Sequence, residues 1–90
     1  MKDITIKCEA KGTGYWLALD ESDLVMINGE ANPKPQRNPG IYYLVWHMIG
    51  KPGDSIKITA NAGGKSLGKI ETKIPSGQDK EAGVMKLDVQ

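Results

Sequence analysis

The chain contains one long unbroken apolar and aromatic run, residues 40–49, which is bounded by Gly40 and Gly50. The nine residues between these glycines are short for a helix and ordinary for a strand. They are mostly β-branched or aromatic, and such side chains fit the pleated surface of a sheet. Both sets of alternating side chains are largely apolar, so we expect a central strand over 40–49 with both faces at least partly covered.

The two faces of this strand differ in their side chains. Tyr42, Leu44, Trp46 and Met48 share one face because side chains alternate along a strand. This even-numbered face is the best candidate for the core. The odd-numbered face carries Tyr43 and His47, and it is the first place to look for function.

Six further strands are indicated, most of them by period-two alternation and the one at 24–27 by a short run that is apolar on both faces. They are expected at residues 4–8, 15–19, 24–27, 55–60, 65–74 and 82–89. Pro52 and Gly53 match the second and third positions of a type II turn, so we expect an antiparallel hairpin between 40–49 and 55–60. Gly68 interrupts the alternation of its strand and indicates a bulge. Asn28-Gly29 has the composition of a two-residue hairpin turn, but no strand is expected after it.

Residues 30–40 contain three prolines and cannot form an interior strand, because proline lacks a backbone N–H. We interpret them as a long crossover loop. A loop of this length is often functional, and prolines lower the entropy cost of docking it. Lys34 and Arg37 are therefore candidate binding residues, with a plain crossover as the alternative.

Short strands separated by turn signals at intervals of about ten residues, with no convincing helix, are typical of an antiparallel β-sandwich. We predict a small all-β immunoglobulin-like sandwich of about seven strands, with residues 1–90 as one domain. Trp46 on a central strand agrees with this architecture, whereas the paired cysteines of antibody domains are absent. A small barrel of the oligonucleotide-binding type is the alternative, but residues 30–39 cannot supply its helix.

The net charge of +1, from twelve basic and eleven acidic side chains, gives no basis for a nucleic-acid partner. Lys65, Lys69 and Lys73 share a strand face, where lysines commonly protect a sheet edge. A phosphate-binding patch is the weaker interpretation. No apolar stretch approaches the roughly 20 residues of a membrane helix, and no signal peptide is visible. We expect no membrane partner and a cytoplasmic location, with export left open.

Catalytic and metal-binding constellations are not evident. A single histidine, His47, and a single cysteine, Cys8, are too few for a thiolate–imidazole metal site. Cys8 lies in phase with Ile4 and Ile6 and is expected to be a buried structural thiol. The acidic segment 20–23 is interpreted as a solvated turn, with a weak cation site as the alternative. We therefore expect no enzyme, no metal and no cofactor.

Two functions remain. The first is a non-enzymatic interaction module whose partner is a protein, a second copy of the chain included. The second is a module that binds carbohydrate or another small ligand through Trp16, Tyr43 and His47, because an exposed aromatic ring can stack on a sugar. Burial of both Trp16 and Tyr43 would remove the second function, whereas a solvent-open aromatic patch would weaken the first.

Overall fold

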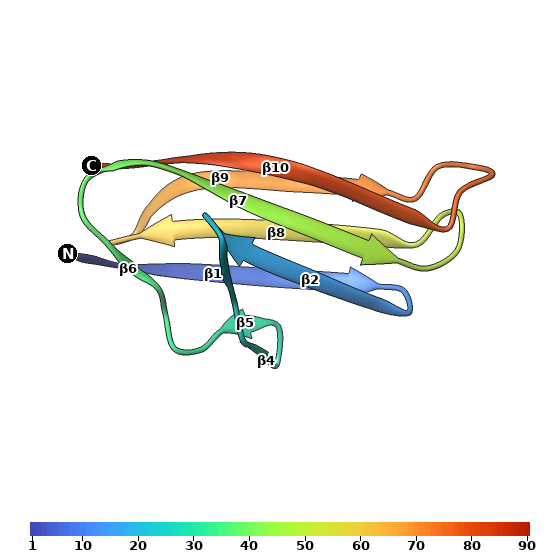
Figure 1. The fold of residues 1–90 in the computed structure, drawn as a ribbon, viewed down its shortest axis with the longest axis horizontal. Coiled ribbons are helices and arrows are strands. Elements are labelled where there is room, and N and C mark those ends of the chain that lie inside the picture. The colour runs from blue at the N-terminus through green and yellow to red at the C-terminus, as the bar shows by residue number, and fades with distance from the viewer.

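The computed structural model describes all residues 1–90 and consists of strands and connections, without a helix (Figure 1). Its strands form two antiparallel sheets. The ten strands are β1 (Lys2–Lys11), β2 (Gly14–Leu19), β3 (Ser22–Asp23), β4 (Met26–Ile27), β5 (Glu30–Ala31), β6 (Gln36–Arg37), β7 (Gly40–Ile49), β8 (Ser55–Ala62), β9 (Lys65–Lys73) and β10 (Lys80–Val89).

We name the two sheets after a long interior strand of each. The β8 sheet has the order β4-β5-β1-β8-β9, with β6 paired to the start of β1. The β7 sheet has the order β10-β7-β2-β3. The expected all-β fold of antiparallel strands is confirmed, and so are the six longer strands. They run one to three residues past their expected ends at several points.

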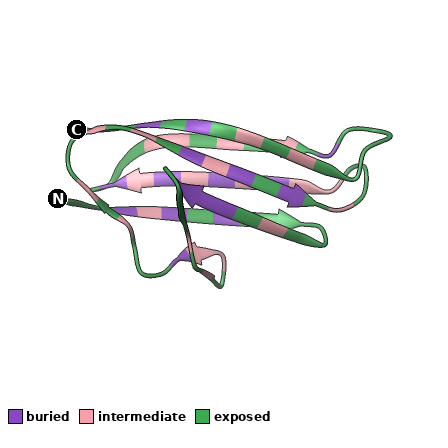
Figure 2. Cartoon of the chain, in the orientation of Figure 1, coloured by how far each residue is buried: buried purple, intermediate pink, exposed green.

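The core lies between the sheets and is built from the inward-facing residues of both. Burial alternates along β1, β7, β8 and β10, as period two requires (Figure 2). Trp46 at the centre of β7 is 2% exposed. The buried core consists of Ile4, Ile6, Cys8, Leu17, Leu19, Ala31, Leu44, Trp46, Met48, Ile56, Ile58, Ala60, Ile74, Met85, Leu87 and Val89.

The connection between β7 and β8 corrects one expectation. Its type II turn is confirmed, since Gly53 has a φ of 91° and the Asp54 N–H donates to the Lys51 carbonyl at 3.0 Å. The expected hairpin is wrong, because β7 and β8 belong to different sheets. The turn is hydrogen-bonded instead to the connection between β9 and β10, where the Gly53 N–H donates to the Ile74 carbonyl at 3.0 Å.

Three connections cross between the sheets at the same end of the molecule. Figure 1 shows the β1–β2, β7–β8 and β9–β10 loops together there, with both termini at the opposite end. A strand whose inner face is apolar can bury it against the other sheet while pairing with other strands at its sides. Turn chemistry alone does not decide between this arrangement and a hairpin.

The segment between β2 and β7 departs most from expectation. Asn28 and Gly29 both have positive φ, 52° and 79°, and join β4 to β5 as a two-residue hairpin. A strand after this turn was not expected. The expected strand over 24–27 is found only in its second half, because only Met26 and Ile27 form a strand there, and they pair only with β5. The crossover after residue 30 is confirmed, since β5 and β6 pair with β1 whereas β7 lies in the other sheet.

A candidate binding face on the β7 sheet

The outer face of the β7 sheet exposes large apolar side chains to solvent, beside the charged Lys80, Lys86 and Asp88 of β10. Trp16 on β2 is 42% exposed, Tyr43 on β7 is 47% exposed and Val84 on β10 is 59% exposed. Ile41 and Ile49 on β7 are exposed beside them. The odd-numbered face of residues 40–49 is thus only partly covered, and it forms a surface patch that needs an explanation.

The register of β2 against β7 places Trp16 directly opposite His47. Their rings meet edge to face, with centroids 5.1 Å apart and an interplanar angle of 88°. The Trp16 Nε1–H donates to Asp23 Oδ1 at 2.9 Å. The indole is therefore held at its edge by a carboxylate and beside it by an imidazole, which leaves part of the ring free for a ligand.

Tyr43 is positioned by the turn that follows β2. The Asp20 N–H donates to the Tyr43 carbonyl at 2.9 Å, and the Tyr43 N–H donates to Asp20 Oδ1 at 3.0 Å. Asp20 adopts a positive φ of 47°, a conformation that Asp tolerates better than most residues. These two bonds fix the acidic turn to β7 next to the phenol.

An open hollow of about 600 Å³ lies between the two aromatic residues. Its floor is apolar and its rim carries carboxylates. Flat rings beside hydrogen-bonding oxygens suit a ligand that has both an apolar face and hydroxyl groups. The lining residues are Trp16, Ala18, Asp20, Glu21, Ser22, Asp23, Tyr43 and Val45.

Among the residues expected at a site, Trp16, Tyr43 and His47 share this face, while Lys34 and Arg37 do not. Arg37 lies on β6 at the edge of the β8 sheet, opposite Lys2, with its guanidinium carbon 5.8 Å from the centre of the Tyr42 ring. Lys34 is exposed in the loop before it. The structure thus separates the aromatic candidates from the basic ones.

Sequence reasoning did not place the acidic turn at the site. The carboxylates of Asp20 and Asp23 both accept N–H donors of the aromatic residues, Tyr43 and Trp16. The one signal in the sequence is that the acidic segment follows the aromatic strand directly. No group of three or more His, Cys, Asp and Glu side chains is arranged to hold a metal ion.

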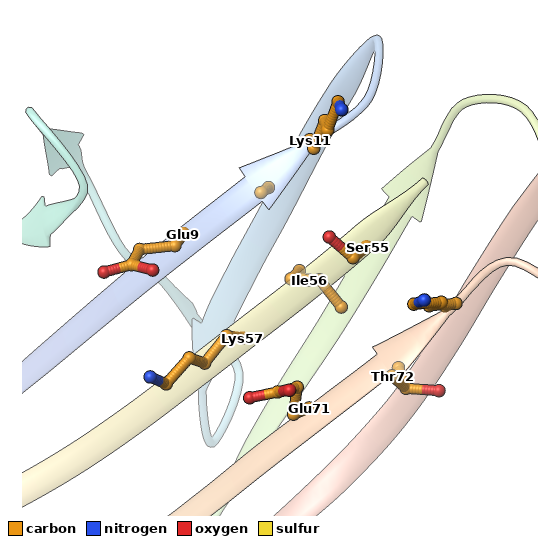
Figure 3. Close-up of a pocket in the computed structure, with 9 residues that line it drawn as sticks. Glu9, Lys11, Ser55, Ile56, Lys57, Glu71 and Thr72 are labelled. Atoms are coloured by element: carbon orange, nitrogen blue, oxygen red, sulfur yellow. The ribbon is translucent and has the colours of Figure 1, made fainter. Parts of the chain in front are cut away.

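The outer face of the β8 sheet is different in chemistry. A hollow of about 520 Å³ lies at one end of β1, β8 and β9 (Figure 3). The register places Glu9, Lys57 and Glu71 side by side on these three strands, so charges of opposite sign are neighbours. Charges that alternate in this way neutralise one another and favour a solvated face over a site for one charged ligand.

Cys8 and His47 do not form a catalytic pair. Cys8 is buried in the core on β1, whereas His47 is exposed on the outer face of the β7 sheet. Burial and, to a lesser extent, the negative charge of Glu9 raise the pKa of the Cys8 thiol to about 11. The thiol is therefore neutral at physiological pH, as expected for a structural cysteine.

Comparisons with protein-family models, with curated proteins and with solved structures find no match for this chain. The structure contains no helix of the length and apolar character that crossing a membrane would require.

Proposed function

We propose that this chain is a non-enzymatic binding module, and that a carbohydrate ring is its ligand in the hollow between Trp16 and Tyr43. The observation that carries this proposal is the exposure of both aromatic rings on one sheet face. A solvent-exposed aromatic patch favours a module that binds a small ligand over a plain protein-interaction module. A sugar stacks one apolar face on an aromatic ring and directs its hydroxyl groups to carboxylate acceptors.

Both aromatic residues are held in place before a ligand binds, and this supports the same ligand class. The Trp16 indole has its N–H already bonded to Asp23 and its edge against His47. A side chain that is fixed before binding loses less conformational freedom when the ligand arrives. The Asp20 bonds to Tyr43 fix the other wall of the hollow in the same way.

The finer fold class is part of this proposal. We infer an immunoglobulin-like sandwich, an architecture that many binding modules share. Two features support it: two antiparallel sheets enclosing one core, and a buried tryptophan, Trp46, on an interior strand.

Calorimetric titration with soluble oligosaccharides tests the function. We would use cello-, xylo-, manno- and chito-oligosaccharides at millimolar concentration. With whichever of them binds, Trp16→Ala and Tyr43→Ala should each weaken the affinity by about tenfold or more, because aromatic anchors dominate binding energy. Trp16→Phe should retain most of the affinity, since it keeps a stacking ring.

Ile49→Ala is the matched control. Ile49 is 59% exposed on the same face but does not line the hollow. Its substitution should leave oligosaccharide affinity unchanged. If none of the four classes binds at millimolar concentration, the carbohydrate is the wrong ligand. If Ile49→Ala weakens oligosaccharide binding as much as Trp16→Ala does, the hollow between Trp16 and Tyr43 is not the binding site.

A further inference from the structure

Three of the four sheet edges carry features that prevent strand addition. β3 and β4 are two residues long each and offer little to pair with. β9 has a register shift opposite Ala60 and Asn61. Short strands and bulges are usual means of protecting an edge.

β10 is an edge of a different kind. It pairs with β7 without interruption, from Lys80 opposite Ile49 to Val89 opposite Gly40. Its ten residues contain no proline and the ladder has no register shift. Such a long regular edge has the backbone geometry that a further strand requires.

The hydrogen-bond phase of β10 identifies the free backbone groups. The Gly50 N–H donates to the Asp79 carbonyl at 2.9 Å, so the odd-numbered residues that follow Asp79 bond to β7. The even-numbered residues therefore direct their N–H and C=O groups away from the sheet. Ala82 agrees with this phase, because its N–H donates to Glu81 Oε1 at 3.2 Å instead of to β7.

We propose that the β10 edge pairs with the β10 edge of a second copy of this chain, antiparallel about a two-fold axis at Val84. In this register Val84 lies opposite itself and Ala82 lies opposite Lys86 of the second copy. Lys80 then lies opposite Asp88 of the second copy, and by symmetry this pair of opposite charges occurs twice. The two β7 sheets become one continuous sheet.

The charge pattern selects this register over its neighbours. An axis one residue earlier would place Lys80 opposite Lys86, which is repulsive, and an axis one residue later would place Asp88 opposite Ala82. At the centre of the selected register, Val84 is 59% exposed and meets a second valine. On pairing, the Ala82 N–H exchanges the Glu81 carboxylate for the Lys86 carbonyl of the second copy.

The dimer should be weak and reversible. One strand edge of ten residues buries less surface than the roughly 1,600 Å² of a standard stable interface. Sedimentation equilibrium of the parent chain at micromolar to millimolar concentration should show a monomer–dimer equilibrium. A parent chain that stays monomeric at millimolar concentration would overturn the proposal.

Two sets of variants locate the contact. Val84→Pro should abolish the dimer, because it removes an N–H that points away from β7 and leaves the β7–β10 ladder intact. Lys80→Asp and Asp88→Lys should each weaken association by about tenfold, and the double variant should restore it. Lys69→Asp on β9 is the matched control and should leave association unchanged. The charge variants keep the test valid if Val84→Pro does not fold.

Amide hydrogen exchange tests which residues of β10 form hydrogen bonds across the dimer contact. The amides of Ala82, Val84 and Lys86 should gain protection as the dimer forms, while those of Gly83 and Met85 are protected already in the monomer. A dimer that persists in Val84→Pro and in Lys80→Asp but dissociates in Tyr43→Ala would place the contact on the outer face of the β7 sheet. That result would overturn the β10 edge as the interface.

Discussion

At the residue scale, Trp46 is the largest side chain of the buried core. It is 2% exposed, and its Nε1–H is buried without a hydrogen-bond partner. We expect Trp46→Ala to lower the free energy of unfolding by about 3–5 kcal/mol, the cost of a large-to-small core substitution. A domain of this size has roughly 5–10 kcal/mol in total, so the variant should be close to unfolded.

Urea unfolding followed by circular dichroism measures this change. Trp16→Ala is the comparison, because it truncates the same residue type on the exposed face and should cost about 1 kcal/mol or less. A Trp46→Ala variant that melts within a few degrees of the parent would show that Trp46 does not anchor the core.

Cys8 makes stability depend on pH in the alkaline range. Its pKa rises from 9.0 to about 11 on folding, mainly through burial and secondarily through Glu9. The neutral thiol is the form that the fold favours, so its full contribution is present below pH 9 and is lost as the pH rises toward 11. The loss should amount to roughly 2 kcal/mol.

The measurement is the free energy of unfolding at several pH values for the parent and for Cys8→Ala. Burial and, secondarily, the charge of Cys8 also raise the pKa of Tyr15, so the difference in slope between the two proteins reports the thiol together with its coupling to Tyr15. If the free energy of unfolding changes with pH equally in both proteins, folding does not raise the pKa of the Cys8 thiol.

At the element scale, β10 and β7 fit together because Gly83 lies against the Trp46 indole. A Cβ at position 83 would lie 2.7 Å from Cζ2 and 2.9 Å from Nε1 of this buried ring. We expect Gly83→Ala to lower the free energy of unfolding by about 1–3 kcal/mol, because the rigid ring has no room to move.

Gly14→Ala on β2 is the matched control for Gly83→Ala. Nothing lies within 4 Å of a Cβ added at Gly14, so we expect no loss and a gain of up to about 1 kcal/mol from the less flexible unfolded chain. Thermal melts of the two variants are sufficient. A neutral Gly83→Ala would show that β10 can shift away from β7.

Strand positions could be read from the sequence because alternation is a local signal. The bulge at Gly68 is an example, since the broken period at Leu67 and Ile70 appears as a register shift opposite Ala60 and Asn61. Sheet membership could not be read in the same way. The turn at Pro52-Gly53 has the same local chemistry whether its flanking strands pair with each other or, as here, with strands distant in sequence.

At the scale of the whole molecule, the two outer faces differ in how much large apolar surface they expose. Polar residues and alternating charges cover the β8 sheet, while aromatic and aliphatic side chains are exposed on the β7 sheet. The placement of Trp16, Tyr43 and His47 on a less covered face could be predicted from strand phase. The role of Asp20 and Asp23 could not, because it depends on backbone and indole N–H groups that only the folded chain brings to them.

The binding hollow and the β10 dimer together define the distance between two ligand sites. Pairing of β10 edges would place both hollows on the same face of one sheet, with five strand spacings between the two copies of β2. At about 4.8 Å per spacing, the Trp16 side chains would be roughly 24 Å apart along the sheet. This separation suits two binding sites on one extended or surface-bound ligand.

The crossings between sheets at one end of the molecule also govern how the chain folds. Because β7 and β8 do not pair, the only long strands joined as neighbours in sequence and in a sheet are β8 and β9. Every other long ladder, such as β1 with β8, closes a large loop before its contacts offset the lost entropy. We therefore expect the β8–β9 hairpin to form first, and the many ladders between distant segments predict folding in roughly milliseconds to seconds.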